Sequence, residues 1–434
     1  MSPANETPLA PIRVLVVGGS YAGLAATLNL LDLCSGKAPR FTPNIEHTSR
    51  PVPVKVTIVD ERDGFYHLIG SPLALASEHY SPKGWMRFED LPALRSQPDL
   101  KCVQGSMKHI DLEQRIATIT NPTTEQSHTE KYDYLIVASG LRRVWPVVPQ
   151  SLTKKTYLYE TSEHIHAVKE SAGGVVVVGG GAVGIEMATE LKTVSADLDV
   201  TLIHSRSKLL SAEPLPDEFK DKTLDLVRES GVKVILDHRV LETTKLEDTP
   251  GKPLWKLKLN DGTSIHQFSG EVPHKEFHFA TGDIVPFSGI KRCGGAMGMG
   301  LQAAVNIHQH ILSTLCGMTP KYMEWPEYPP MIALAVGKTS ISYTPASGVK
   351  FGEDVMKAAF GDDLGLTSEF LMTRAEAALK YNSMHELPAA VYREFACDRS
   401  TAGSGEVVIL ALHDVERESN IYTSTRDNLK LVMP

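Results

Sequence analysis

The sequence has few cysteines and lacks any long hydrophobic run. Because no two cysteines have the CxxC spacing of a zinc or redox site, the chain is unlike a disulfide scaffold and fits a reducing compartment. No apolar stretch reaches the roughly 18 residues that a membrane-spanning helix needs. The first residues, MSPANETPLAPIR, have neither the apolar core of a signal peptide nor the Arg-rich pattern of a transit peptide, so we expect a cytoplasmic protein. The five cysteines are Cys34, Cys102, Cys293, Cys316 and Cys397.

An excess of basic residues is also missing. The formal net charge is −8, so the chain has no surplus of Lys and Arg to neutralise nucleic-acid phosphates. Its 434 residues, 42% of them hydrophobic, suffice for two or three domains with full cores. We therefore expect a multi-domain protein whose partner is a small molecule and not a nucleic acid.

The most informative stretch is GVVVVGGGAVGIEMATELK, which spans 174–192. Val175–Val178 predicts a strand buried on both faces, and the motif Gly179-x-Gly181-x-x-Gly184 follows it directly before a helix. Such glycines allow a tight turn, close approach of the backbone to a pyrophosphate, and close packing of helix on strand. A glycine-rich turn without a ligand is the alternative. The order of strand, motif, helix and the further strand Val200–His204 favours a dinucleotide site.

A related pattern stands near the start of the chain. The predicted strand Ile12–Val17 leads into Gly18-Gly19-Ser20-Tyr21-Ala22-Gly23 and then a helix. Ser20 replaces the second glycine, but a small residue still lets the backbone approach a phosphate, and its hydroxyl can donate a hydrogen bond. The next strand, Val54–Val59, ends in Asp60-Glu61-Arg62. An acid at that strand end binds a ribose hydroxyl in dinucleotide folds; the alternative is that Asp60 merely ends the strand.

Three later segments fit the same scheme. Ser139 and Gly140 follow the predicted strand Tyr132–Val137, at an edge that borders the cofactor crevice in open α/β sheets. Thr281-Gly282-Asp283 follows the strand Phe277–Ala280 and precedes a glycine-rich helix start. The strand Val200–His204 continues into Ser205 and Arg206, where an NAD-selective site usually carries an acid. A neutral residue with an arginine suits a 2′-phosphate instead.

Taken together, these motifs resemble the flavoproteins of the pyridine-nucleotide-disulfide oxidoreductase superfamily. The segments VVGGSYAGLAA, VTIVDER, YDYLIVASGLRR, VVVVGGGAVGIEMATELK, VTLIHSR and FATGD resemble its apoptosis-inducing-factor-like branch, in particular the fungal form of the ferroptosis-suppressor-type NAD(P)H:quinone oxidoreductases. The CxxxxC redox pair of other branches is missing, which disfavours disulfide reduction. The resemblance covers about 12–365 and implies an α/β fold with two Rossmann-like, three-layer ββα domains and a C-terminal α+β region.

The resemblance also implies domains, cofactors and site residues. It places an FAD-binding domain at 1–150 and 271–330, an NAD(P)H-binding domain at 151–270, and a C-terminal region at 331–434. It assigns Glu186 to the family's GVE/GIE acid near the site of hydride transfer, the alternative being a solvated helix acid. FAD is implied at Gly18, Gly19, Ser20, Ala22, Gly23, Asp60, Arg62, Ser139, Gly140 and Asp283, the last on the ribityl chain. NADPH or NADH is implied at Gly179, Gly181, Ala182, Gly184, Ser205 and Arg206. We expect no metal site, because His308 and His310, two apart on a helix, point to different faces.

The expected function is an FAD-dependent oxidoreductase that passes hydride from NAD(P)H through flavin to a quinone-like or small aromatic acceptor. A dedicated tailoring step in a biosynthetic pathway is a variant of this function. The alternative is a non-catalytic or impaired nucleotide-binding flavoprotein, because only residues 263–276 stand where family members have a strand, an excursion and a return strand. The strand candidate Gly405–Leu412 in the otherwise unassigned tail either fills this gap or the domain is loose. Oligomeric state and peripheral membrane contact stay open.

Overall fold

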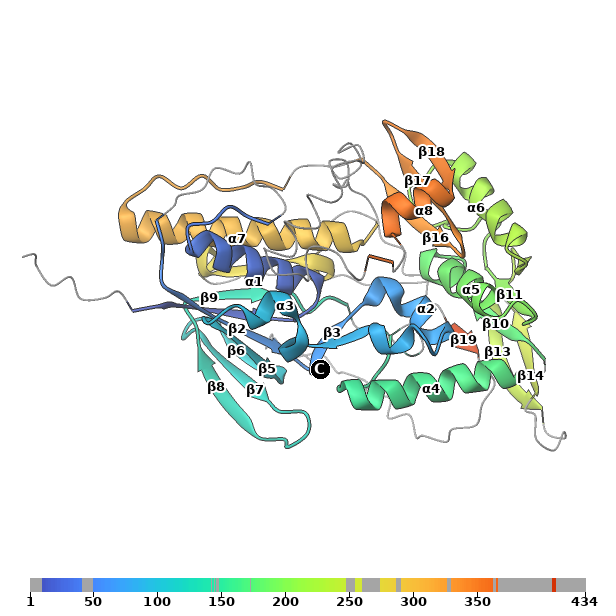
Figure 1. Cartoon of the computed structure of the whole chain (residues 1–434), viewed down its shortest axis with the longest axis horizontal. Helices are drawn as coiled ribbons and strands as arrows, with labels where there is room; N and C mark the ends of the chain where they lie inside the picture. Colours follow the sequence, from blue (N-terminus) through green and yellow to red (C-terminus); the bar gives the residue numbers. More distant parts are fainter. Residues whose placement is uncertain are drawn as a thin grey trace, which may run out of the picture.

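The computed structural model describes residues 10–40, 50–141, 143, 145, 148–171, 173–246, 254–259, 274–285, 290–325, 329–361, 364–365 and 408–410. Figure 1 shows two α/β units side by side, with a small C-terminal unit against the second. The α/β class predicted from the sequence is confirmed. The predicted domain boundaries stay predictions.

The first unit is built on a parallel sheet covered on both faces. Alternate residues of its central strands pack against α1 and α7 on one side and against the antiparallel sheet β6–β8 on the other, which is the predicted three-layer arrangement (Figure 1). The sheet has the order β15-β9-β1-β2-β5, in which each neighbouring pair is parallel. Its strands are β1 (Ile12–Val17), β2 (Val54–Asp60), β5 (Leu100–Gln104), β9 (Tyr134–Val137) and β15 (His278–Ala280). Its covering elements are α1 (Tyr21–Cys34), α7 (Cys293–Cys316), β6 (Ser106–Asp111), β7 (Ile116–Thr120) and β8 (Ser127–Lys131).

The second unit has a smaller sheet with the order β12-β11-β10-β19. The first three of these strands are parallel to one another, as the motif order predicts. The elements are β10 (Val175–Val178), β11 (Val200–Ile203), β12 (Lys233–Ile235), α4 (Lys154–Glu170), α5 (Ala182–Val194) and α6 (Asp217–Glu229). A two-stranded ribbon, β13 (Val240–Leu246) with β14 (Leu254–Leu259), follows.

The fourth strand of the second sheet comes from the tail. β19 (Val408–Leu410) pairs antiparallel with β10, with Ile409 opposite Val177. It lies within the predicted strand candidate 405–412 and covers the edge of β10 that would otherwise be open. The tail therefore fills the gap in the second sheet. The short segment 263–273 lies outside the described residues.

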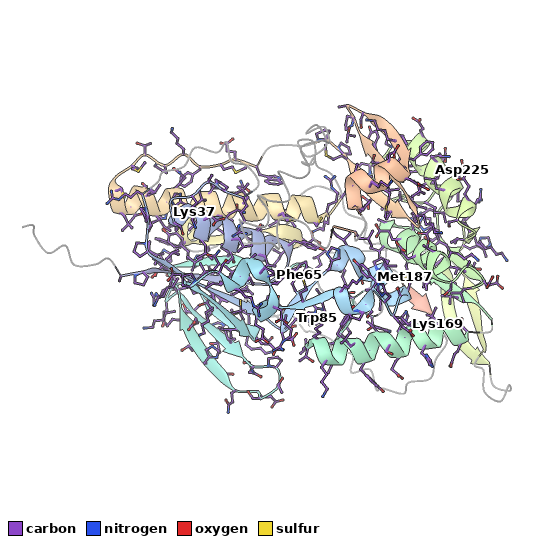
Figure 2. The ribbon with its side chains drawn as sticks, viewed as in Figure 1. Lys37, Phe65, Trp85, Lys169, Met187 and Asp225 are labelled. Atoms are coloured by element: carbon purple, nitrogen blue, oxygen red, sulfur yellow. The ribbon has the colours of Figure 1, made fainter. Side chains whose placement is uncertain are left out.

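One segment of the first unit joins the two units. Its helix α2 packs against α5. Its rings Tyr66 and Trp85 lie against Tyr157 of α4 at centroid distances of 5.5 and 5.1 Å, and 5.9 Å from each other. Figure 2 shows Trp85 near the middle of the molecule, between Phe65 and the helix that carries Met187. The elements of this segment are β3 (Gly64–Tyr66), η1 (Leu68–Gly70), α2 (Ser71–Ala76), η2 (Ser81–Lys83), β4 (Trp85–Arg87), η3 (Phe88–Asp90) and α3 (Pro92–Arg95).

The C-terminal unit is a three-stranded antiparallel sheet with one helix, as the predicted α+β region requires. Leu334, Val336 and Ile341 point into the hydrophobic core that also holds β10 and α5. The elements are β16 (Ile332–Val336), β17 (Thr339–Thr344), β18 (Gly348–Gly352) and α8 (Glu353–Phe360). The short η4 (Lys275–Phe277) and η5 (Gly282–Ile284) flank β15. None of the helices in the described ranges is long and apolar enough to cross a membrane.

We predict that Ile409→Pro destabilises the second unit by about 1–3 kcal/mol, since proline cannot donate to the ladder with β10. Thermal unfolding followed by circular dichroism measures the effect, and flavin content should persist because β19 pairs only with the second sheet. Ile409→Val is the matched control and should leave the unfolding temperature unchanged. If deletion of 367–434 alters neither unfolding temperature, flavin content nor turnover, β19 has no stabilising role.

Candidate dinucleotide sites

The first turn has a shape that only glycine permits at two positions. Gly18 has φ +105°, and a Cβ placed on it would lie 2.4 Å from the carbonyl oxygen of Ala138 at the end of β9. A Cβ on Gly23 would lie 1.8 Å from the Gly18 carbonyl oxygen. Both contacts are far inside van der Waals distance, so the turn between β1 and α1 depends on these glycines.

The end of β2 holds this turn in place. The Asp60 carboxylate accepts the Gly19 N–H at 2.6 Å and the Arg62 N–H at 2.8 Å. Burial raises the pKa of Asp60, and these two hydrogen bonds act in the opposite direction. The Arg62 guanidinium instead donates to the Pro149 carbonyl at 3.2 Å and lies over the Trp85 ring. The structure therefore brings Asp60 to the turn and directs Arg62 toward the junction of the two units.

The other residues predicted for FAD gather beside the first turn. Ser139 lies against it, with its Cα 3.1 Å from a Cβ placed on Gly18. Gly282, which precedes Asp283, contacts Ala22 closely, and the Arg143 Nη2 lies 3.5 Å from the Asp283 carboxylate. The helices α1 and α7 pack closely here, since a Cβ on Gly300 would lie 2.4 Å from the Ala22 carbonyl oxygen.

The start of α1 offers free hydrogen-bond donors. Ser20 is its N-cap residue but makes no side-chain capping bond, and the first turn of α1 has no acidic residue. The start of α5, with Gly181 as N-cap, has the same properties. Unpaired N–H groups and the positive end of the helix dipole suit a phosphate. The residues present therefore fit a dinucleotide at each turn.

The second turn repeats the geometry of the first. Gly179 has φ +113°, and a Cβ on Gly184 would lie 1.9 Å from the Gly179 carbonyl oxygen. Gly181, by contrast, has no atom within 4 Å of a Cβ placed on it. The fold does not require glycine at this position, which agrees with Ser20 at the equivalent place in the first turn. The space beside Gly181 is open to a ligand, as a dinucleotide turn requires.

The neutral strand end predicted for the second site is present. Ser205 and Arg206 follow β11 after His204, and Arg206 is exposed. Its guanidinium makes no ion pair with the side chains that the structure describes. Arg206 is therefore available to a charged group of a ligand.

Two carboxylates occupy neighbouring turns of α5, of which Glu190 is buried and Glu186 half-buried. Burial raises the pKa of Glu186 to about 8; nearby Glu190 also raises it, and the Ala335 N–H lowers it. Burial raises the pKa of Glu190, which is 4% exposed, to about 7. This environment does not fit the solvated helix acid that was the alternative for Glu186. At neutral pH the pair retains protons that ordinary glutamates would have lost.

Three features of these sites were not predicted from the sequence. His204 accepts the Gly180 N–H at 3.0 Å through Nδ1. Glu190 adds a second buried carboxyl, for which the only sequence signal is its i, i+4 spacing from Glu186. The Tyr21 hydroxyl lies 3.0 Å from His67 Nδ1, and His67 Nε2 lies 3.1 Å from the Leu364 carbonyl oxygen. Because a carbonyl only accepts, Nε2 carries the hydrogen and Tyr21 donates to Nδ1.

The histidines that we predicted not to bind metal have other contacts. His310 Nδ1 lies 2.7 Å from the Tyr134 hydroxyl, and His308 is buried in the packed face of α7. Within the part of the chain that the structure describes, no three His, Cys, Asp or Glu side chains are grouped as metal ligands.

Comparison with known proteins gives the class. Residues 12–270 match the sequence profile of the pyridine nucleotide-disulphide oxidoreductase family, and the chain belongs to this family. It is therefore an oxidoreductase of a family whose members use a pyridine nucleotide and a flavin-type cofactor.

Among curated proteins, the chain is 47% identical to oxidoreductase OXR1 of Ajellomyces capsulatus over 412 residues, which cover 84% of this chain and 89% of that protein. It is 24% identical to ferroptosis suppressor protein 1 of Homo sapiens over 254 residues, 58% of this chain and 60% of that one. Apoptosis-inducing factor homolog B of Dictyostelium discoideum is 23% identical over 52% of each chain. The predicted resemblance to this branch is confirmed.

Solved structures agree on the fold. The sulfide:quinone oxidoreductase of Aquifex aeolicus matches with a TM-score of 0.56 at 16% identity, covering 90% of this chain and 100% of that one. A water-forming NADH oxidase of Lactobacillus brevis, bound to NADH, matches with a TM-score of 0.52 at 20% identity, covering 76% and 74%.

The open space at Gly181 leads to a prediction about the second turn. Gly181→Asp should keep the wild-type unfolding temperature, because aspartate suits an N-cap position and its Cβ meets no protein atom, and should weaken nucleotide binding at least about tenfold, because its carboxylate would repel a pyrophosphate. Gly184→Ala, the matched variant, should lower the unfolding temperature as well. Titration calorimetry with NADP⁺ and thermal unfolding measure the two effects. Unchanged affinity in Gly181→Asp would contradict the placement of the nucleotide.

The pKa of Glu190 leads to a prediction about pH. Its folded-state pKa is about 7, above the usual value, so the folded chain binds a proton that the unfolded chain releases between about pH 4.5 and 7. Stability should therefore fall as pH rises through this range. Glu190→Gln should reduce the loss between pH 5 and pH 8 by about 1–3 kcal/mol, measured by urea unfolding at both pH values. An equal loss in variant and wild type would show that Glu190 does not titrate in this way.

Proposed function

We propose that the chain passes hydride from NADPH or NADH through FAD to a quinone-like or small aromatic acceptor. The observation that carries this proposal is the pair of equivalent turns. In the first turn a backbone N–H donates to the Asp60 carboxylate at the strand end, and in the second a backbone N–H donates to the neutral His204 imidazole. Two dinucleotides of different chemistry suit this pair. The sulfide:quinone oxidoreductase and ferroptosis suppressor relatives support the proposed flow of electrons.

FAD suits the first turn. The N–H groups at the start of α1 would bind its pyrophosphate, and Asp60 would accept from a ribose hydroxyl. Asp283 would accept from the ribityl hydroxyls, because it lies in η5, which packs against α7, and next to Gly282, which approaches Ala22. The flavin would supply the redox chemistry, while the chain binds it, orients it and excludes water.

NADPH suits the second turn. Arg206 is charged and exposed, and Ser205 adds a hydroxyl, whereas no acid stands at this strand end to repel a 2′-phosphate. An engineered NADPH oxidase supports this choice. It was made from the Lactobacillus brevis NADH oxidase by five substitutions, which include Asp to Ala and, at the next position, Ala to Arg.

Glu186 and Glu190 would hold a proton near the nicotinamide side. Glu186 lies where α5 meets β16, within reach of the Ala335 N–H. A protonated carboxyl donates a hydrogen bond, whereas an ionised one only accepts. The raised pKa of Glu186 therefore favours a neutral donor at this place.

We also place the chain in the cytoplasm, in keeping with the free thiols of Cys34, Cys102, Cys293 and Cys316.

An anaerobic titration tests the proposal. NADPH should bleach the yellow flavin spectrum of the purified chain, and a short-chain quinone should restore it.

A specific observation favours a second candidate, a non-catalytic flavoprotein: the second sheet takes one of its strands from the tail. Binding of NADPH without bleaching would favour that candidate. A purified chain without flavin would refute the proposal.

We predict that Arg206→Glu shifts the donor preference toward NADH. The substitution removes the charge partner of the 2′-phosphate and adds a repelling carboxylate. The ratio of kcat/KM for NADPH to that for NADH should fall at least about tenfold, measured by stopped-flow reduction of the flavin. Arg228→Glu, on exposed α6, is the control for charge alone. A wild-type chain that strongly prefers NADH would contradict this interpretation.

A further inference from the structure

The two dinucleotide turns are closed by the same hydrogen bond. In the first, the Gly19 N–H donates to Asp60 Oδ2 at 2.6 Å; in the second, the Gly180 N–H donates to His204 Nδ1 at 3.0 Å. Gly19 and Gly180 each follow the first glycine of their motif. Asp60 ends β2, and His204 directly follows β11. His204 therefore occupies the place of the strand-end acid.

The hydrogen bonds determine which nitrogen of His204 carries the hydrogen. A backbone N–H only donates, so Nδ1 must be the unprotonated acceptor and Nε2 must carry the hydrogen. Nε2 lies 3.1 Å from the Ser211 hydroxyl oxygen. Burial lowers the pKa of His204, and Arg206 lowers it further, while the Lys208 backbone and Asp237 act in the opposite direction. The ring is neutral at pH 7, and its Nε2–H is directed to Ser211, so it offers no carboxylate oxygen where Asp60 offers one.

The main chain around His204 fixes its position. Its own N–H donates to the Ile235 carbonyl at 2.8 Å, and its carbonyl accepts the His238 N–H at 3.0 Å. A Cβ on Gly180 would lie 2.7 Å from the imidazole Cγ, so the turn packs directly on the ring. The position of the imidazole is therefore fixed by the main-chain hydrogen bonds of His204 and by its packing against Gly180.

We propose that His204 sets the nucleotide choice of the second site, because it accepts the Gly180 N–H as an acid would but places no carboxylate at the strand end. A carboxylate at this position would accept from the ribose hydroxyls of NADH and would repel a 2′-phosphate. Arg206 supplies charge, whereas His204 removes the competing acceptor without opening the turn. This inference rests on the proposed function of the second turn as an NAD(P)H site.

Three variants separate the two roles of His204. His204→Asp keeps an acceptor for the Gly180 N–H, as the first turn shows, but restores the acid. His204→Asn keeps an acceptor and stays neutral, and His204→Leu removes the acceptor. Calorimetry on the flavin-loaded full chain gives the dissociation constants of NADP⁺ and NAD⁺, and the flavin absorbance reports that the first unit is intact.

His204→Asp should lower the ratio of NADP⁺ to NAD⁺ affinity at least about tenfold, and His204→Asn should keep the wild-type ratio within about twofold. His204→Leu should weaken both nucleotides by a similar factor, because the turn loses its acceptor while selectivity is unaffected. An unchanged ratio in His204→Asp, with both nucleotides still bound, would overturn the inference alone. Binding of neither nucleotide by the wild-type chain would refute the proposed function and the inference with it.

Discussion

Both nucleotide sites depend on one close contact between two glycines. In each turn the last glycine of the motif packs against the carbonyl of the first, at a distance that leaves no room for a methyl group. This contact brings the start of the helix against the end of the strand and so directs the free N–H groups of the helix into the crevice. The strand-end side chain then fixes the remaining N–H of the turn. Asp60 and His204 are alternatives for that task, and their different chemistry distinguishes two sites of the same shape.

The second sheet is subject to another constraint, its open edge. A parallel strand such as β10, whose residues alternate between buried and half-buried, cannot leave one edge unpaired without exposing its backbone groups to competing strands. Here β19 covers that edge from more than two hundred residues downstream in the chain. It runs antiparallel, which a distant segment can do without the crossover helix that a parallel neighbour requires. The second sheet therefore gains a fourth strand, although the segment 263–276, from which a further strand was expected, is short.

Local sequence patterns predicted the parts of the fold that local contacts determine. The valine-rich strands β1 and β10, both glycine turns and the helices after them follow from neighbouring residues, and all are present. Contacts between residues far apart in the sequence were harder to predict. The strand 405–412 could be predicted from its composition, but its partner and direction could not. The pairing of Tyr21 with His67 and Leu364 joins three segments that share no pattern. For His204, the absence of charge at the strand end could be predicted from the sequence, but the hydrogen bond to Gly180 could not.

In the proposed function, the two candidate sites act together only if the junction between the units is rigid. Hydride transfer needs its reacting atoms about 3–3.5 Å apart, so a small shift of one unit against the other would lower the rate. The contacts at the junction favour a rigid arrangement. Trp85 is fully buried, its ring lies against Tyr66 and Tyr157, and its Nε1–H donates to Asp63 at 2.8 Å. Asp63 also accepts the backbone N–H of Lys154, where α4 begins. One carboxylate thus ties the aromatic cluster to the helix that leads into the second unit. Because the same hydrophobic core continues from Trp85 to β10 and β16, a displacement at any of these elements would reach both sites.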